Sequence, residues 1–483
     1  MKTNPKALGS LAAAPSHPMP ELEAGLVQAA GMLQEFYAGL EARRVSAAIS
    51  SPEIEALFAD TLGEAGVGVE AALRDAERWL MPHAMTVPHP LYLGLINSSP
   101  MAGGIVAESL IAGLNNNSGS WIQGPPFMAA EQEVVRCFRE LLGLPEETTG
   151  IVLPGGSYAS LHGLQLARES RLPQWRKEGA RALSGDPRVY VSSASHFSAA
   201  RSAMALGVAD RDVVSLPTLG RGRIDARALA AQLREDTERG ALPFALVATL
   251  GTTGTGALDR LPELVELCRE FGLWLHVDAC YGGAAALVQE LGPHFEGLAE
   301  ADSVAVDPHK WFFIPMVAGL LLTRHTELEL EVFDIDASYI PTGEYVDSFR
   351  RSLTTSRRGS AFAIWMALRA HGLGSVRSTV ERNIALTRRL EAKLALEGLR
   401  VMPDGELSVA CARWEPEGKT PEQLDALQGQ FAAAVSESGD AWFGCVRAQG
   451  QTWLRFNLVN LYTREEHIDF LAKRLGERLR AWV

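Results

Sequence analysis

Two patterns of apolar and polar positions follow one another along this chain and divide it into a helical beginning and a mixed remainder. Between residues 21 and 79, apolar side chains recur every three or four positions, which predicts amphipathic helices. The first 20 residues are rich in Pro, Ala and Ser and lack this period. We therefore expect them to be extended or disordered.

From about residue 150 to residue 324, short apolar runs alternate with amphipathic segments. Strands separated by helices need crossover connections, which are right-handed and give a mainly parallel sheet. In such sheets ligands bind at the carboxyl ends of the strands. The predicted strands are Gly150 to Leu153, Val189 to Ser192, Phe244 to Leu250, Leu273 to Asp278 and Ser303 to Val306.

The last part of the chain changes pattern again. A long helical stretch, Ala361 to Leu399, is interrupted at Gly372 to Gly374. The runs Leu407 to Trp414 and Thr452 to Val459 predict strands, and the capping-box sequence Thr463 to Glu466 opens a final helix. The predicted domains are a helical segment over residues 1–88, a large α/β domain over residues 89–370 and a small α+β domain over residues 371–483.

The composition is that of an ordinary globular protein, with 47% hydrophobic and 21% charged residues among 483. A net charge of −13 argues against a broad basic surface for nucleic acid or for an acidic membrane. The longest apolar run, Trp311 to Leu322, is too short to span a bilayer. Five scattered cysteines without zinc-like spacing favour a reducing cytoplasm and predict no metal site.

A lysine, Lys310, lies between two apolar runs in the sequence DSVAVDPHKWFFIPMVAG, which extends from Asp302 to Gly319. A buried lysine is rarely left unpaired, because its ammonium group loses hydration. Taken alone, Lys310 is most simply a surface-loop residue. The alternative is an amine whose pKa falls by desolvation, so that it can form a Schiff base with a carbonyl group. The residues upstream decide between the two.

Four other predicted strands also lead into residues that can carry chemistry. Gly156 and Ser157 follow the first strand and open a helix, where backbone N–H groups and the hydroxyl could bind an anion. His196 and Thr253 follow the next two strands. Asp278 ends the fourth, where a carboxylate could keep a heteroaromatic nitrogen protonated. Each alone has an ordinary interpretation: a glycine-rich turn, a core histidine, a loop threonine and a capping aspartate.

Together and in this order, ending in Asp307-Pro308-His309-Lys310-Trp311, the motifs resemble the pyridoxal phosphate (PLP) dependent group II amino-acid decarboxylases, of the aromatic-L-amino-acid and glutamate decarboxylase type. The resemblance covers roughly Pro88 to Phe470. It implies the fold-type-I PLP-dependent transferase fold: a large α/β domain with a mainly parallel, seven-stranded type of sheet and a small α+β domain. It also implies PLP as cofactor and conversion of an L-amino acid to its amine and CO₂.

The resemblance also assigns roles to individual residues. Lys310 would form the Schiff base, Asp278 would pair with the pyridine nitrogen, and His196 would stack on the ring. Tyr339 falls where the aromatic decarboxylases have a loop tyrosine that helps to protonate the carbanion. The implied cofactor-binding residues are Gly156, Ser157, His196, Thr253, Asp278, Cys280, Asp307, His309 and Lys310, and the implied substrate-binding residues are His89, Leu95, Ile96, Asn117 and Arg357.

Some positions depart from the family pattern. Cys280 stands where the family usually has alanine and would press against the cofactor ring. Leu95 and Ile96 fall where aromatic-acid decarboxylases tend to have aromatic side chains. An apolar wall slightly favours an aromatic or other hydrophobic substrate, whereas Asn115 to Asn117 could suit a polar one. The identity of the amino acid stays open.

The same scaffold also supports different reactions. Relatives that produce aldehydes often replace the loop tyrosine or the stacking histidine, so Tyr339 and His196 favour decarboxylation over an aldehyde synthase. An aminotransferase and a non-catalytic partner of a true decarboxylase also stay open. By resemblance we expect a homodimer with active sites at the subunit interface, in which residues 1–88 pack on the partner. Apart from a small amino-acid substrate, no nucleic acid or membrane partner is predicted.

Overall fold

The structure is a computed structural model that describes residues 19–47, 49–334 and 345–482. The chain divides into two compact units, Met1–Thr86 and Val87–Val483. Within the described residues, none of the helices combines the length and the apolar character needed to cross a membrane.

The first unit confirms the helices expected between residues 21 and 79. No residue of its three α-helices, all of which the structure describes, is buried. Apolar side chains such as Leu26, Val27 and Phe58 therefore stay about half exposed or more. The elements are α1 (Leu22–Ala38), η1 (Leu40–Ala42), α2 (Ser51–Phe58) and α3 (Val69–Trp79).

The second unit contains the predicted mainly parallel sheet, with seven strands in the order β1-β9-β8-β7-β6-β2-β3. Only β9 runs antiparallel to its two neighbours. Strands β3 and β9 were not among the predicted ones, while the five predicted strands are present. The strands are β1 (Thr149–Leu153), β2 (Pro187–Ser192), β3 (Val213–Leu216), β6 (Leu242–Thr249), β7 (Trp274–Asp278), β8 (Ser303–Val306) and β9 (Gly319–Thr323).

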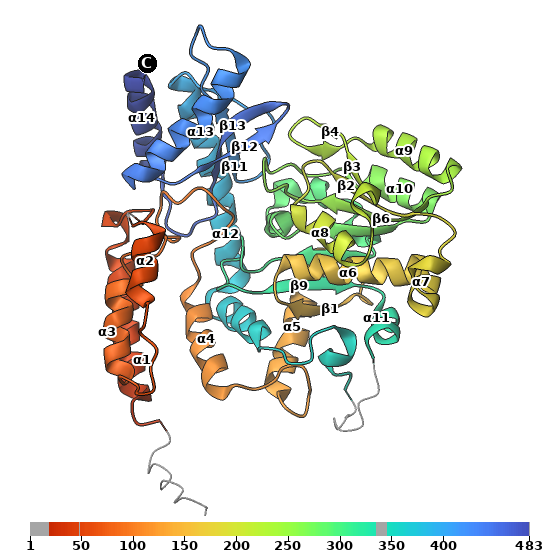
Figure 1. Cartoon of the computed structure of the whole chain (residues 1–483), viewed down its shortest axis with the longest axis horizontal. Coiled ribbons are helices and arrows are strands. Elements are labelled where there is room, and N and C mark those ends of the chain that lie inside the picture. The colour runs from red at the N-terminus through yellow and green to blue at the C-terminus, as the bar shows by residue number, and fades with distance from the viewer. Residues whose placement is uncertain (1–18, 48, 335–344, 483) are drawn as a thin grey trace, which may run out of the picture. The chain divides into compact units, whose positions relative to one another are not determined.

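Helices pack on both faces of this sheet, as strands buried on both faces require (Figure 1). Residues of α6, α7, α8 and α11 build the core on one face, and residues of α5, α9, α10 and α12 build it on the other. These helices are α5 (Pro125–Leu141), α6 (Gly156–Arg171), α7 (Pro173–Glu178), α8 (Phe197–Ala205), α9 (Ala226–Glu238), α10 (Leu261–Phe271), α11 (Thr326–Phe333) and α12 (Ser360–Leu396).

Shorter elements complete this part. The helix α4 (Ala102–Leu114) packs against α12. A two-stranded sheet joins β4 (Thr218–Leu219) to β5 (Arg223–Ile224). The 3-10 helices are η2 (Ala180–Ala182), η3 (Asp210–Asp212), η4 (Gly282–Leu287), η5 (Gln289–Phe295), η6 (Leu298–Glu300) and η7 (Ser348–Arg351).

The chain ends in an antiparallel sheet with the order β10-β11-β13-β12, the predicted α+β part. The long helix α12 breaks at Gly372 (φ 75°, ψ 151°), inside the predicted interruption. The predicted domain boundary at residue 370 falls within this helix, and both boundaries stay predictions. The elements are β10 (Arg400–Val401), β11 (Val409–Arg413), α13 (Pro421–Ser438), β12 (Gly444–Ala448), β13 (Gln451–Asn457) and α14 (Glu465–Trp482).

The segment before α4 is attached to this C-terminal part. The Leu93 N–H donates to the Trp442 carbonyl at 2.7 Å, and the Leu93 carbonyl accepts from the Asn457 N–H at 2.7 Å. Asn460 Nδ2 donates to the His89 carbonyl at 3.0 Å. These bonds fix the predicted substrate-side segment to the small sheet rather than to the large one.

Candidate active site

Lys310 lies in the turn that follows β8. Its N–H donates to the Asp307 carbonyl at 2.9 Å, and its Nζ lies 2.9 Å from Asp307 Oδ2. The Lys310 side chain is 21% exposed, and that of Asp307 is buried. Burial is the largest single effect on the pKa of Lys310 and lowers it, but the neighbouring acidic groups, Asp307 foremost and then Cys280 and Asp278, together outweigh it, and the pKa is raised. The sequence-based expectation of a lowered pKa is therefore wrong for this structure, because the amine has an acidic partner.

The turn before α6 meets the same residues. A side chain at Gly156 is excluded, because its Cβ would lie 2.6 Å and 2.9 Å from the two Asp307 oxygens and would collide with Cys280 Sγ. Asp307 Oδ1 is buried and has no hydrogen-bond partner among the residues that the structure describes. A buried acceptor without a donor is costly, and a bound group that brings a donor would relieve it.

Asp278 ends β7, beside β8 in the parallel register Asp278 to Ala305. Because parallel strands end at the same edge, Asp278 and Asp307 lie at neighbouring strand ends. Asp278 Oδ1 accepts the Cys280 N–H at 3.0 Å, and the Cys280 carbonyl accepts the Asp307 N–H at 3.3 Å. Cys280 is buried. It thus joins the two strand ends through its backbone.

His196 is the N-cap residue of α8. Its Nδ1 lies 2.7 Å from Ser198 Oγ, and 3.3 Å from the Ser198 N–H, which donates to it. Partial burial and the positive charge of Lys310 lower the pKa of His196, against the opposing effects of Asp278 and Asp307. A neutral imidazole suits stacking on a ring better than a cationic one.

The remaining predicted cofactor residues are Ser157, Thr253 and His309. Ser157 is exposed in the first turn of α6, where the leading N–H groups of a helix lack intrahelical partners and favour an anion. Thr253 is half-buried, and its carbonyl accepts from Arg455 Nε at 2.8 Å. His309 is buried and its Nδ1 lies 2.6 Å from the Ala318 carbonyl oxygen.

The predicted substrate-side residues are more dispersed. Leu95 is 54% exposed, whereas Ile96 is part of the hydrophobic core. His89 Nδ1 accepts the Leu91 N–H at 3.0 Å. Asn117 Oδ1 accepts two backbone N–H groups, those of Gly119 and Arg357, each at 2.9 Å. Of these side chains only Leu95 combines exposure with freedom from such contacts.

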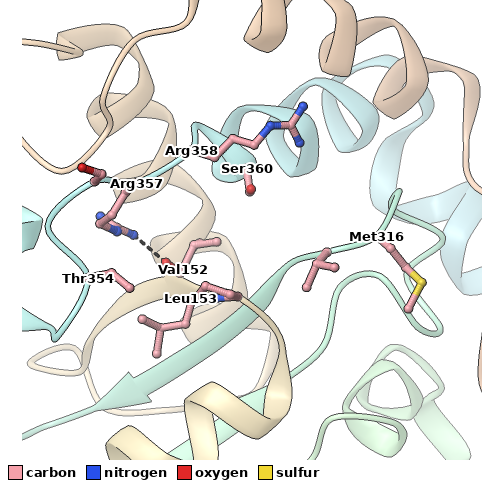
Figure 2. Close-up of a pocket in the computed structure, with 10 residues that line it drawn as sticks. Val152, Leu153, Met316, Thr354, Arg357, Arg358 and Ser360 are labelled. Carbon is pink, nitrogen blue, oxygen red and sulfur yellow. Dashed lines mark hydrogen bonds between the residues drawn. The ribbon is translucent and has the colours of Figure 1, made fainter. Parts of the chain in front are cut away.

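Arg357 makes contacts within the chain that account for its burial. Its Nη2 donates to Glu131 Oε1 at 2.7 Å and to the Val152 carbonyl at 2.5 Å, and its Nη1 donates to the Ser118 carbonyl at 3.3 Å. It lines a cavity of about 430 Å³ beside the start of the glycine turn. Figure 2 shows Arg357 directed toward Val152, with Met316 on the opposite side of the cavity.

This cavity borders the candidate site without including its chemistry. Pro154 lines it, and Val317, another lining residue, would lie 3.3 Å from a Cβ at Gly155. Lys310, Asp278 and His196 are not among its lining residues. The cavity therefore lies beside the turn that leads into α6, and these three residues do not line it.

The structure does not describe one predicted site residue, and it shows one arginine contact that the sequence analysis did not predict. Tyr339 lies outside the described residues. Arg455, on β13, is buried; its guanidinium also donates to the Gly94 carbonyl and so joins the substrate-side segment to the Thr253 loop. No described carboxylate pairs with it, and its buried Nη2 has no hydrogen-bond partner in the described part of the chain. The sequence signal that could have identified Arg455 is an arginine within an otherwise apolar strand.

The donor set fits a phosphorylated pyridine aldehyde. A helix N-terminus suits a phosphate, a carboxylate suits a protonated ring nitrogen, and a lysine suits an aldehyde. With the mainly parallel sheet and the small C-terminal domain, these features define a fold-type-I PLP-dependent enzyme. The chain belongs to the pyridoxal-dependent decarboxylase family, whose conserved-domain model matches residues 53–409.

Curated relatives span nearly the whole chain. An aromatic-L-amino-acid decarboxylase of Bacillus atrophaeus is 27% identical, over 92% of this chain and 93% of that protein. An L-2,4-diaminobutyrate decarboxylase of Rhizobium meliloti (strain 1021) is 30% identical, over 87% and 84%. A 4-hydroxyphenylacetaldehyde synthase of Rhodiola rosea is 24% identical over 93% of each chain. Its crystal structure has a TM-score of 0.88, with 97% of this chain and 100% of that chain covered.

These findings confirm four predictions: the family, the fold class, PLP as cofactor, and the enzyme class. The protein is a PLP-dependent carboxy-lyase. Its relatives differ in the substrate and even in the product that their names state, so similarity alone leaves the amino acid open.

Proposed function

We propose that this enzyme decarboxylates an L-amino acid with an aromatic or other hydrophobic side chain to the amine and CO₂. The observation that carries the preference is Leu95, an apolar side chain that is 54% exposed on the segment fixed to the small sheet. An apolar surface gains free energy by covering apolar substrate groups and offers nothing to a charged one. The name of the Bacillus atrophaeus relative supports the same preference.

We assign the cofactor side as follows. Lys310 holds the cofactor through its amine, the turn at Gly156 and Ser157 holds the phosphate, and Asp278 holds the proton on the ring nitrogen. When bound, PLP supplies the electron sink for the pair of electrons left when CO₂ departs. His196, neutral because its pKa is lowered mainly by burial, covers the ring and excludes water. Thr253, Cys280, Asp307 and His309 line the cofactor pocket.

The final step needs a proton at Cα, and we assign its delivery to Tyr339 with His196 beside it. On the substrate side, Leu95 contacts the substrate side chain, while His89, Ile96, Asn117 and Arg357 hold the wall from behind. The hydrogen bonds that His89, Asn117 and Arg357 make within the chain support this role.

CO₂ release from the cofactor-loaded protein tests this proposal. The substrates are the twenty standard amino acids with DOPA, 5-hydroxytryptophan and 2,4-diaminobutyrate, and the amine is identified by mass spectrometry. We expect the highest kcat/KM with an aromatic or large aliphatic substrate. A preference for 2,4-diaminobutyrate or for an acidic amino acid would contradict the assignment to Leu95.

A decarboxylating aldehyde synthase is the second candidate, because the Rhodiola rosea relative has that name. Such a reaction consumes O₂ and releases peroxide and ammonia with the aldehyde. A peroxide assay in the same reactions separates the two. His196 and Tyr339 support the amine product. We therefore expect less than about one-tenth as much peroxide as CO₂.

We also propose a homodimer with the active sites at its interface. Val106, Leu110 and Leu114 form an exposed apolar stripe on α4, and Met316 and Val317 are exposed beside the cavity. Exposed apolar groups at such spacing are typical of an interface. Light scattering gives the mass, and Leu110→Lys should yield monomers with little activity. The five unpaired cysteines support a reducing, cytoplasmic location.

A further inference from the structure

His196 caps α8 in an uncommon way. The residues that usually cap a helix start are Ser, Thr, Asp and Asn, whose short side chains accept a backbone N–H. Here the acceptor is an imidazole: Nδ1 of His196 accepts the Ser198 N–H at 3.3 Å, and Ser198 Oγ lies 2.7 Å from the same nitrogen. Ser198 is buried, and among the described residues its hydroxyl has no other hydrogen-bond partner. One ring nitrogen is therefore held by two groups of the same residue.

These two contacts decide which ring nitrogen of His196 carries the proton. A backbone N–H can only donate, so Nδ1 must present its lone pair to the Ser198 N–H and carries no proton itself. The Ser198 hydroxyl can either donate or accept, and beside an unprotonated Nδ1 it must donate. A neutral imidazole has one N–H, so the proton of His196 is on Nε2.

Two further side chains of α8 restrict the same ring. The Phe197 ring lies 4.0 Å from the imidazole, centre to centre, at an interplanar angle of 35°. A ring so close blocks rotation of the imidazole on that side. The Arg201 guanidinium lies 4.4 Å from the centre of the Phe197 ring, within reach of a cation–π contact. Its charge opposes a second proton on His196.

Charged groups from three elements act on this imidazole: Arg201 on α8, Asp278 at the end of β7, and Asp307 and Lys310 after β8. Burial is the main cause of the lowered pKa of His196. Lys310 and Arg201 lower this pKa further, while the two aspartates raise it. The surroundings therefore favour the neutral ring, for which the choice between the two tautomers matters.

We propose that Ser198 is a positioning residue that fixes the tautomer of His196, so that the imidazole meets the bound substrate with an Nε2–H donor and not with a base. This inference rests on the proposed place of His196 over the cofactor ring. Because Nδ1 is bonded to the start of α8, Nε2 is the nitrogen left for the bound groups. An N–H at Nε2 donates to an acceptor oxygen and cannot remove a proton from the substrate.

Nitrogen NMR of the cofactor-loaded protein with isotope-labelled histidine tests the tautomer, since protonated and unprotonated ring nitrogens differ widely in chemical shift. His196→Gln identifies the signals of this ring among those of the eleven histidines. At neutral pH we expect an unprotonated Nδ1 and a protonated Nε2 in wild type. A protonated Nδ1 overturns the proposal.

Substitutions at Ser198 test whether its hydroxyl fixes the tautomer. Ser198→Ala removes the 2.7 Å contact, and the ratio of the Nε2–H to the Nδ1–H form should fall about tenfold, the typical effect of losing one hydrogen bond. Ser198→Thr keeps a hydroxyl and should restore the ratio to within about threefold. Ser202→Ala, at another buried serine of α8, is the matched control and should keep the wild-type ratio.

The outcomes separate this inference from the proposed function. If Ser198→Ala keeps the wild-type ratio, or if threonine behaves like alanine, Ser198 does not fix the tautomer and the inference is wrong. The proposed function is untouched in that case, because CO₂ release by wild type is measured independently. If wild type shows the expected tautomer but neither retains PLP nor releases CO₂, the proposed function fails, and the donor role of Nε2 fails with it.

Discussion

The cofactor side and the substrate side of this site are built in different ways. On the cofactor side, Asp278, Asp307 and Lys310 follow two adjacent parallel strands, so the sheet itself brings their side chains together. On the substrate side, Asn117 and Arg357 lie in loops and bond to the chain's own backbone and to Glu131. Strand ends carry the residues that we assign to the chemistry, and loops carry those that we assign to the substrate side.

The largest effect should come from the cofactor side. Lys310→Ala removes the amine to which we assign the cofactor, and we expect kcat to fall about 10⁴-fold or more. Covalent retention of PLP after borohydride reduction should be lost as well. Lys419→Ala, at an exposed loop lysine, is the control and should keep both. Normal turnover in Lys310→Ala would remove the basis of the cofactor-side assignment.

The cofactor side was also the part that the sequence predicted best. Residues at the ends of strands β7 and β8 keep their order in any parallel sheet, so Asp278 and Lys310 could be expected to meet before the structure was known. The fold followed from the same alternation. Strand β9 was missed because its apolar residues continue the apolar run that begins at Trp311, and β3 because it is only four residues long and only partly buried.

The substrate side was harder to predict for a physical reason. A loop residue's environment depends on contacts with distant segments, such as Arg357 with Glu131, 226 positions away. No local pattern reports such a contact. Arg455 was missed on the same ground, since its acceptors at Gly94 and Thr253 lie on two other segments of the chain. The Lys310 pKa was misjudged because the acidic groups around the amine, Asp307 foremost, together outweigh the effect of burial.

Arg357→Ala should reveal a structural residue rather than a substrate contact. The change leaves Glu131 buried without its cation, and breaking a buried pair typically costs about 3 kcal/mol or more of unfolding free energy. Urea unfolding measures this loss. Arg447→Ala is the control. It should be nearly neutral, because Arg447 is 72% exposed and lies 3.5 Å from its partner Asp425. If Arg357→Ala instead folds normally and raises only KM, Arg357 contacts the substrate.

His276 on β7 should make the cofactor side sensitive to acid. Burial lowers its pKa from the usual 6.5 to about 4. His276 therefore binds a proton near pH 6.5 in the unfolded chain but only near pH 4 in the folded chain. Stability from this group is fully present above pH 6.5 and falls by about 3 kcal/mol as the pH drops to 4.

Urea unfolding at pH 7 and pH 4.5 checks this expectation. Wild type should lose more stability between the two values than His276→Gln, whose side chain does not titrate. His371→Gln, at an exposed histidine that accepts the Gly103 N–H, should behave as wild type does. Equal losses in wild type and His276→Gln would mean that the buried imidazole is protonated as easily as in the unfolded chain.

The smallest effect should come from Leu95, to which we assign the contact with the substrate side chain. Leu95→Asp places a carboxylate on the exposed apolar wall, and it should shift the kcat/KM ratio of 2,4-diaminobutyrate to a hydrophobic substrate upward by about tenfold. Leu95→Asn introduces a side chain with nearly the shape of aspartate but without its charge. It therefore separates the electrostatic effect from the loss of apolar surface. Leu219→Asp is the matched control, since Leu219 on β4 is also 54% exposed but belongs to another part of the unit. An unchanged ratio in Leu95→Asp would place substrate selection elsewhere. The first alternative is the pair of segments that Arg455 joins. The same substrate comparison in Arg455→Lys would test it.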